Sequence, residues 1–498
     1  MNLSSALHTN ASNHPDKVAL FCGDARMTYR ELDESSTLLA QWFLDQGLRP
    51  GDRVALHWSN SIEVVQLFFA LFRAGLIAVT VNVRLKPPEI RYVLDHSQAR
   101  MCFSDPALAR LAEQAGATCP ILSQLPRLEF RHSSALPVVD PDSPAAILYT
   151  SGTTAHPKGV THTHRSLCHT AAFVARVGID TDDVVLAVTQ VMHAAALNGV
   201  LLPALHVGAV AVLLPAFEPS AVLDAIERFR CTYTVCLPAL LQFVVEEQAR
   251  QPRQVSSLRT ILAGGDTVSV ALQNRFEAMF GIPSREVYGM TESLPVTVNP
   301  KAAIRPGSLG TRAGGLDIRL VDLGGRDVPE GETGEIVVRS AANFIGYWND
   351  PAATKDAIED GWVHTGDLAS RDRDGYYWFK GRKKQIIIRA GSNISPQEVE
   401  EALYQHPAVL EAGVVGAPHP VYGETVAAFV VLRKGQRVDA QSLRLFAQRH
   451  LADYKVPDNI LFLEELPKGL MGKVHRRALK EMLLANPAIL EHAAVVEA

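Results

Sequence analysis

Apolar helix-length segments that lead directly into short β-branched strands constrain the fold of this sequence more than any other feature. Residues 62–72 are predicted to form a helix, Ala74-Gly75 its end, and residues 77–81 a buried strand. A second unit repeats this order, with a buried helix that begins near Ala194 and a strand at residues 209–214. Repeated helix-then-strand units predict an α/β fold with mostly parallel sheets.

After about residue 310 the pattern of strands and turn residues changes. Segments 317–322, 334–340 and 375–381 are short strands between Gly-, Pro- and Asp-rich turns, which indicates a smaller, β-barrel-like part between about residue 310 and Lys380. After Ser395, alternating helices and strands predict a small α+β unit. Because 498 residues exceed what one core usually holds, we expect a large multi-subdomain N-terminal domain at residues 1–383 and a small C-terminal domain at residues 384–498.

Composition and charge exclude several classes of function. The formal net charge is −5 and both signs are mixed along the chain, so no basic stripe for nucleic acid is present. The most apolar run, residues 194–215, is interrupted by Gly199 and Pro203, and the N-terminus lacks a basic start followed by an apolar stretch. We therefore expect a cytoplasmic protein without stable membrane insertion that acts on small molecules; monomer and homodimer both remain open.

The segment YTSGTTAHPKGV, residues 149–160, is the most informative local signal. A Ser-, Thr- and Gly-rich loop after a buried strand lets backbone N–H groups and hydroxyls converge on phosphate oxygens, and a lysine adds positive charge. The loop is not a GxxxxGK[ST] P-loop, because its lysine follows a proline and no Ser or Thr comes after it. The expected phosphate-binding residues are Ser151, Gly152, Thr153, Thr154 and Lys158.

Further motifs follow this loop in order: YGMTE at residues 288–292, TGD at residues 365–367, and Gly381-Arg382. Together with the loop they resemble the signatures of the adenylate-forming superfamily, which contains acyl-CoA synthetases, peptide-synthetase adenylation domains and luciferases. The resemblance spans essentially the whole chain, although Ala155 stands where the family usually has glycine. It implies that ATP and coenzyme A are cosubstrates and that the enzyme uses Mg²⁺.

The resemblance also implies a nucleotide site. In the family pattern Tyr288 stacks on adenine, Thr291 contacts phosphate, Glu292 holds magnesium, Asp367 accepts the ribose hydroxyls, and Arg382 reaches the ribose or a phosphate. Chemistry independently supports the magnesium role of Glu292. Attack on an α-phosphate requires a cation that neutralises the departing pyrophosphate, and a carboxylate is the natural ligand for such a cation. Further expected nucleotide-binding residues are Gly264, Asp266 and Gly289.

The C-terminal region resembles the mobile domain of the same family. Lys384 falls at the position of the family's hinge, and a residue there absorbs a backbone dihedral change. Gly391 falls beside the channel for the thiol's pantetheine arm. Lys473 resembles the adenylation lysine, which bridges the substrate carboxylate and the α-phosphate. The residues Leu470-Met471 before it differ from the family's usual sequence.

Segments that resemble the family's substrate-lining elements predict the acyl pocket. His193 matches a position near the substrate carboxylate, where it could donate a hydrogen bond or be a packed core histidine. No acidic residue occurs between Gln190 and Leu197, where amino-acid-activating relatives usually place an aspartate, so an apolar or ring-bearing acid is favoured. With Thr153, Glu292 and Lys473, His193 completes the expected catalytic set. The expected pocket residues are His193, Ala194, Leu237, Gly265, Met290 and Leu294.

These inferences predict a two-step ligase. The carboxylate attacks ATP to give an acyl-adenylate and pyrophosphate, and coenzyme A then takes the acyl group and releases AMP. Transfer to an amino acid or other amine, transfer to a free-standing carrier protein, a luciferase-like oxygenation, and a catalytically silent nucleotide-binding relative remain alternatives. The intact set of Thr153, Glu292, Asp367, Arg382 and Lys473 speaks against the last.

Overall fold

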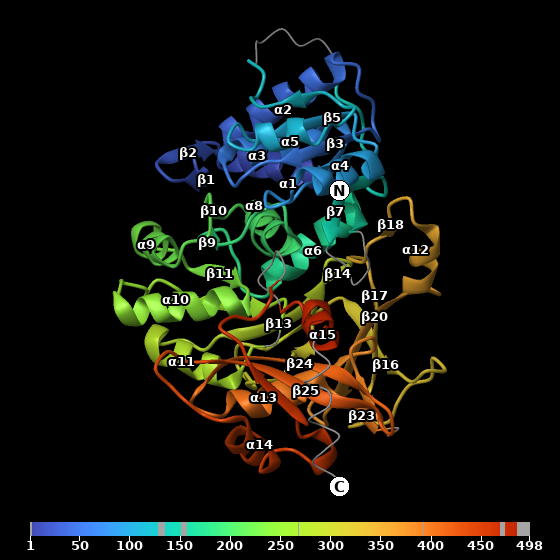
Figure 1. The fold of residues 1–498 in the computed structure, drawn as a ribbon. Coiled ribbons are helices and arrows are strands. Elements are labelled where there is room, and N and C mark those ends of the chain that lie inside the picture. The colour runs from blue at the N-terminus through green and yellow to red at the C-terminus, as the bar shows by residue number, and fades with distance from the viewer. Residues whose placement is uncertain are drawn as a thin grey trace.

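The computed structural model describes residues 2–127, 135–150, 157–266, 268–390, 392–468 and 474–485. Three β-sheets organise these residues, and helices cover them (Figure 1). The expected mixed α/β class, with a large N-terminal part and a small C-terminal part, is confirmed. The earliest helices of the chain are α1 (Leu3–Asn13) and α2 (Tyr29–Asp45).

One sheet of the N-terminal part runs in the order β18-β8-β7-β4-β3-β5-β6. It contains the first predicted helix–strand unit: α3 (Ile62–Ala74) ends at Gly75, whose φ of 70° is left-handed, and β4 (Ile77–Thr80) pairs in parallel with β3 and β7. The other elements are β3 (Arg53–His57), α4 (Pro87–Ser97), β5 (Met101–Ser104), α5 (Ala109–Gln114), β6 (Ile121–Leu122), β7 (Pro144–Thr150), β8 (Lys158–Thr163), α6 (His164–Arg176) and β18 (Gly346–Tyr347).

The largest sheet begins with parallel strands in the order β1-β10-β9-β11-β12-β13, and β2 pairs antiparallel to β1 at its edge. The second predicted unit lies here: α7 (Ala194–Ala196), a π-helical turn η1 (Leu197–Leu201) and α8 (Leu202–Val207) lead into β10 (Val210–Leu213). The remaining elements are β1 (Val18–Cys22), β2 (Ala25–Thr28), β9 (Val184–Ala187), α9 (Pro219–Phe229), β11 (Tyr233–Cys236), α10 (Pro238–Arg250), β12 (Thr260–Gly264), α11 (Val270–Phe280) and β13 (Arg285–Met290).

The predicted antiparallel part is present, but it starts earlier than residue 310 and is not a separate sheet. The chain reverses directly after β13, where Met290 pairs with Ser293, so β14 continues the parallel sheet as an antiparallel strand. One run of strand pairing therefore reaches from β2 to β16. The added elements are β14 (Ser293–Val298), β15 (Gly310–Arg312), β16 (Leu316–Val321), β17 (Gly334–Ser340), α12 (Pro351–Ala357), β19 (Ile358–Glu359), β20 (Trp362–Arg371) and β21 (Tyr376–Arg382).

The C-terminal sheet has the order β23-β22-β25-β24, with β26 beside β25. Its core lies between this sheet and α13 and α14, while α15 packs on the opposite side of β24 and β25. The elements are β22 (Ile387–Arg389), β23 (Ser392–Ile394), α13 (Pro396–Tyr404), β24 (Val409–His419), β25 (Gly423–Leu432), α14 (Ala440–Gln448), a short 3₁₀ turn η2 (Asp453–Lys455), β26 (Asn459–Phe462) and α15 (Arg476–Leu484).

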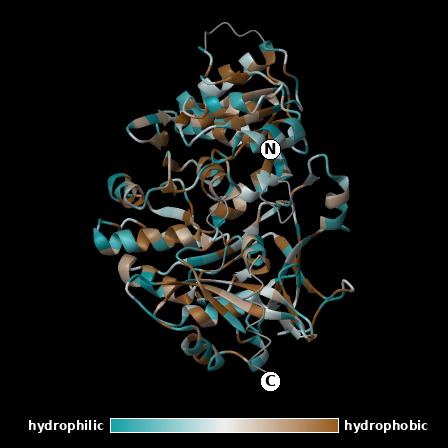
Figure 2. Ribbon diagram, in the orientation of Figure 1, coloured by the Kyte–Doolittle hydropathy of each residue, from teal (hydrophilic) through white to brown (hydrophobic). Residues whose placement is uncertain are grey.

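Apolar residues concentrate on the inner strands and on the helix faces that cover them (Figure 2). Buried positions of α3 and α8 pack around the parallel strands in one extended core, and α9, α10 and α11 form a second core on β10, β11 and β12. Among the described residues, no helix combines the length and apolar character needed to cross a bilayer.

Gly310→Ala should destabilise the junction between β14 and β15. Gly310 has a φ of +81°, and a Cβ there would lie 2.2 Å from the backbone nitrogen of Asn299. A non-glycine residue in a left-handed conformation costs about 1–3 kcal/mol, and contact with rigid backbone adds to this cost. Gly325→Ala is the matched control, because its φ is +74° and its Cβ would meet nothing within 4 Å. Urea unfolding should show a clearly larger loss for Gly310→Ala; equal losses would contradict the steric argument.

Candidate functional site

A cavity of about 770 Å³ lies where β13, β20 and β21 meet the C-terminal part of the chain. Thr150 at the end of β7 and Lys158 at the start of β8 both line it, so the predicted phosphate loop leaves and re-enters the described structure at this cavity. The predicted residues that it brings together are Lys158, Gly265, Asp266, Tyr288, Gly289, Met290, Thr291, Glu292, Asp367, Arg382 and Lys384.

Several predicted residues cannot be placed from this structure. Ser151, Gly152, Thr153, Thr154, Gly391 and Lys473 lie outside the described residues. Of the others, His193, Ala194, Leu237, Gly264 and Leu294 are described but are not among the residues that line the main cavity.

The Asp367 carboxylate connects two parts of the largest sheet. Its Oδ2 accepts a hydrogen bond from the Tyr288 hydroxyl on β13 at 2.8 Å, and its Oδ1 accepts one from Nε of Arg382 on β21 at 3.0 Å. Asp367 is 5% exposed and Tyr288 is 9% exposed. Burial, followed by the Asp367 charge, holds the pKa of Tyr288 well above its usual value, so this phenol stays protonated and fixes its ring.

Glycines bring the strands beside Tyr288 close together. A Cβ on Gly264 would lie 2.2 Å from the carbonyl oxygen of Val287, so β12 can approach β13 only without a side chain at this position. A Cβ on Gly289 would lie 2.6 Å from Cδ1 of Leu294. Gly265, with a φ of +87°, similarly packs under Leu237, whose Cδ2 would lie 2.7 Å from an added Cβ. These three positions therefore leave no space for a side chain.

Glu292 also lines this cavity. Its Oε1 accepts a hydrogen bond from the Tyr347 hydroxyl at 2.7 Å, and Nζ of Lys158 lies 4.6 Å from the centre of the Tyr347 ring. The backbone carbonyl of Thr291 accepts from Nε2 of His162 at 2.7 Å, and burial lowers the pKa of this histidine to about 4. His162 was not predicted to act here, and nothing in its spacing could have indicated this contact.

These residues fit a magnesium ion that arrives with ATP. A buried carboxylate beside a lysine is suited to a hard cation whose remaining ligands are phosphate oxygens and water. Within the described ranges no group of three or more His, Cys, Asp or Glu side chains could hold a metal by itself. Glu292 is therefore suited to share the ion with a nucleotide.

His193 lies at the N-terminus of α7, where its carbonyl accepts the backbone N–H groups of Ala196 and Leu197. Burial, followed by the positive charge of Arg84, lowers the pKa of His193 to about 4. The imidazole is thus neutral at physiological pH. It can donate one hydrogen bond and accept another without carrying a charge.

The C-terminal part contributes residues that the sequence did not single out. Gln397, Val474 and Arg476 line the same cavity, and Arg476 donates both to Oε1 of Glu400 at 2.8 Å and to Oε2 at 2.7 Å. This ion pair is buried and joins the start of α15 to α13. It fixes the Arg476 side chain at this cavity.

Two carboxyl groups in this region, of Glu286 on β13 and Glu401 on α13, have raised pKa values. Glu286 on β13 is 5% exposed, and its Oε2 has no hydrogen-bond partner among the described residues. Burial raises the pKa of Glu286 to about 8, with a smaller contribution from Glu401 on α13. Burial, followed by the Glu400 charge, raises the pKa of Glu401 to about 7. Both carboxyl groups therefore retain protons near neutral pH.

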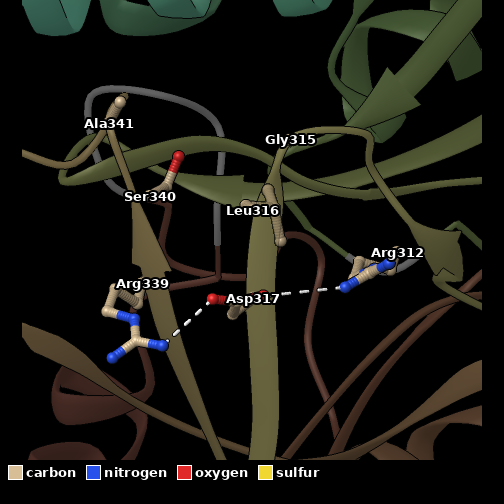
Figure 3. Close-up of a pocket in the computed structure, with 7 residues that line it drawn as sticks. All are labelled: Arg312, Gly315, Leu316, Asp317, Arg339, Ser340 and Ala341. Carbon is tan, nitrogen blue, oxygen red and sulfur yellow. Dashed lines mark hydrogen bonds and ion pairs between the residues drawn. The ribbon is translucent and has the colours of Figure 1, made fainter.

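A separate hollow of about 370 Å³ lies on an exposed part of β16 and β17 (Figure 3). Its Asp317 carboxylate lies 3.2 Å from the guanidinium of Arg339 and 3.8 Å from that of Arg312. The charges in this hollow are thus paired with one another in contact with solvent, where such pairs contribute little. We assign it no function.

The main cavity thus gathers most of the described residues that the motifs predicted to bind a nucleotide, and residues of the C-terminal part complete its lining. The family model "AMP-binding enzyme" matches residues 7–348, and "AMP-binding enzyme C-terminal domain" matches residues 398–473. The chain therefore belongs to the AMP-binding enzymes of the adenylate-forming superfamily, as the sequence motifs predicted.

Full-length relatives agree with this membership. The chain is 35% identical to the sulfoacetate–CoA ligase of Cupriavidus necator, over 96% of this chain and 97% of that protein, and 36% identical to the feruloyl-CoA synthase of an Amycolatopsis species, over 93% and 96%. The crystal structure of the anthranilate CoA ligase AuaEII with anthranoyl-AMP superposes with a TM-score of 0.91 at 30% identity, over 97% of this chain and 98% of that chain.

Glu286→Gln should stabilise the protein at alkaline pH and have little effect at acidic pH. The folded protein keeps a proton on Glu286 up to about pH 8, whereas the unfolded chain releases it near the usual glutamate value, so this group's contribution to stability is lost as pH rises through that window. Glutamine is neutral at every pH, and it should gain about 1–3 kcal/mol over wild type at pH 8.5.

Urea unfolding at pH 5.5 and pH 8.5 measures this difference. Glu277→Gln, at an exposed position on neighbouring α11, is the control and should show no such pH dependence. An equal effect of Glu286→Gln at both pH values would mean that the carboxyl group is ionised in the folded protein.

Proposed function

We propose that this protein is an AMP-forming acid–CoA ligase that activates an apolar carboxylic acid as its acyl-adenylate and transfers the acyl group to coenzyme A. The observation that carries the proposal is the convergence of Tyr288, Glu292, Asp367 and Arg382 on one cavity that the C-terminal part of the chain also lines. Full-length similarity to enzymes named as CoA ligases supports the choice of acceptor.

For the first step, we assign adenine to the part of the cavity beside Tyr288, with Gly264 on the neighbouring strand, and the ribose to Asp367 and Arg382. The Ser151–Thr154 segment and Lys158 bind the phosphates. Lys473 bridges the substrate carboxylate and the α-phosphate, where negative charge increases during attack. Glu292 would hold Mg²⁺, which neutralises charge on the departing pyrophosphate. Further contacts to the nucleotide come from Asp266, Gly289 and Thr291.

For the second step, we propose that residues 384–498 rotate as a domain about Lys384 relative to residues 1–383. The rotation removes Lys473 from the site and brings Gly391 beside the path of the thiol. The sheets are consistent with this division, since the largest sheet ends at Arg382 and the C-terminal sheet begins at Ile387. The thiol attacks the acyl carbonyl, and AMP leaves with the electron pair of the broken acyl–phosphate bond.

The acyl group is assigned to the space bounded by His193, Ala194, Leu237, Gly265, Met290 and Leu294. The neutral state of His193 favours a hydrogen bond to the substrate carboxylate rather than an ion pair. The small side chain of Ala194 and the absence of an acidic residue between Gln190 and Leu197 favour a ring-bearing or otherwise apolar acid. Consumption of ATP and coenzyme A is consistent with a cytoplasmic location.

Mass spectrometry of reactions with ATP, Mg²⁺ and a panel of acids tests this function. The panel should contain aromatic acids, medium-chain fatty acids and one anionic acid such as sulfoacetate, each with coenzyme A or with amino acids. Acyl-CoA with AMP is expected for the apolar acids. Acyl-amino-acid products formed only in the second set would make the protein an amide-forming ligase, and no pyrophosphate release with any acid would make it a silent nucleotide-binding relative.

Lys473→Ala should separate the two half-reactions. Removal of the ammonium group takes away charge stabilisation from the adenylation transition state, so ATP–pyrophosphate exchange should fall by about 10²–10³-fold. Thioester formation from supplied acyl-adenylate and coenzyme A should be nearly unchanged, because Lys473 is outside the site in that step. Arg477→Ala, which alters an exposed arginine paired with Glu481, is the control. Equal loss of both half-reactions would rule out the assigned role.

A further inference from the structure

The last residue held by the largest sheet is Lys383, which makes one backbone and one side-chain contact to it. Pairing between β20 and β21 reaches Asp367 opposite Arg382, and one more backbone hydrogen bond follows, from Lys383 N to Gly366 O at 2.8 Å. Nζ of Lys383 also donates to Oε2 of Glu335 on β17 at 3.1 Å, and Oε1 of Glu335 accepts the N–H of Gly366 at 3.0 Å. One carboxylate therefore holds both strands at the point where the sheet ends.

Glu335 is suited to this role because it is buried and ionised. Its side chain is 7% exposed, whereas that of Lys383 is 47% exposed. Burial opposes the charge on Glu335, but the Lys383 ammonium and the Gly366 N–H outweigh it and hold its pKa below the usual value. His364 lies 3.4 Å from the same carboxylate. A buried carboxylate with a lysine partner resists separation, since loss of the partner would leave a charge uncompensated.

Contacts to β20 and β17 end at the following residue, Lys384. Lys384 is exposed, and within the described residues it makes no hydrogen bond or ion pair. The next backbone N–H groups, of Gln385 and Ile386, donate to Arg382 O at 2.8 and 3.0 Å. The first residue that can change its dihedral angles without breaking a contact to β20 or β17 is therefore Lys384.

We propose that Glu335 and Lys383 are positioning residues that fix the pivot of domain rotation, by holding the chain up to Lys383 against the large domain so that the rotation occurs at Lys384. This inference rests on the proposed two-step function. The pair lies on the large-domain side of the pivot, so it persists in both orientations. Without it, rotation also occurs at Lys383, the small domain samples additional orientations, and each productive orientation is less populated.

Lys383→Ala and Glu335→Gln test the anchor in separate half-reactions. ATP–pyrophosphate exchange and thioester formation from supplied acyl-adenylate should both slow, by about 10- to 100-fold, as expected when reacting groups are misplaced by about 1 Å. KM for the acid should stay unchanged, because the acid binds to the large domain alone. Rates should be measured well below each variant's melting temperature, so that loss of folded protein does not contribute.

Rescue and control variants distinguish the anchor from a general structural role. Lys383→Arg keeps the ion pair and should restore both rates, whereas Lys380→Ala removes an exposed lysine of the same strand and should leave them at wild-type values. Restoration of neither rate by Lys383→Arg, or a Lys383→Ala variant with wild-type rates, would overturn the proposal.

Amide hydrogen exchange provides a measurement that does not depend on activity. The backbone N–H of residue 383, which donates to Gly366 O in the wild type, should exchange faster in Lys383→Ala and Glu335→Gln and at the wild-type rate in Lys383→Arg and Lys380→Ala. Unchanged exchange in all variants would refute the anchor. If wild type activates no acid, the proposed function fails, while the exchange comparison still decides whether the anchor exists.

Discussion

The hydrogen bonds that Asp367 accepts from Tyr288 and Arg382 constrain the site more than any other interaction. A carboxylate that is 5% exposed is stable only when its oxygens are well partnered, and here the partners come from β13 and β21. The parallel and antiparallel strands of the largest sheet are thereby fixed relative to each other. Both the cavity walls and the end of the sheet at Lys383 depend on this arrangement.

Local chemistry explains why much of the fold could be predicted from the sequence. The helix that ends at Gly75 and the strand Ile77–Thr80 were recognisable because the apolar spacing, the left-handed glycine and the β-branched run all indicate the same structure. The strands after residue 310 were likewise separated by clear turn residues. The junction at Met290 and Ser293 was missed because a tight reversal inside the YGMTE motif has no Gly-Pro or Asn-Gly signal of its own.

The site likewise contains residues that the sequence could reveal and residues that only the structure reveals. Tyr288, Glu292, Asp367 and Arg382 were found because each lies within a short ordered motif, and the structure brings them to one cavity. Contacts between distant segments left no such pattern: Glu286 meets α13 more than a hundred residues later, and Arg476 pairs with Glu400. In a single sequence these are ordinary charged residues, since only packing shows that they are buried and which groups they face.

The uninterrupted pairing from β2 to β16 limits where this protein can be divided. A chain cut between Arg382 and Ile387 leaves every sheet whole, because no strand pairing crosses that point among the described residues. A chain cut after β13 would instead expose a long row of unpaired N–H and C=O groups, which is a template for aggregation. Recombination between related enzymes can therefore exchange the small domain as a module, whereas the nucleotide-binding half must be inherited together with its antiparallel strands.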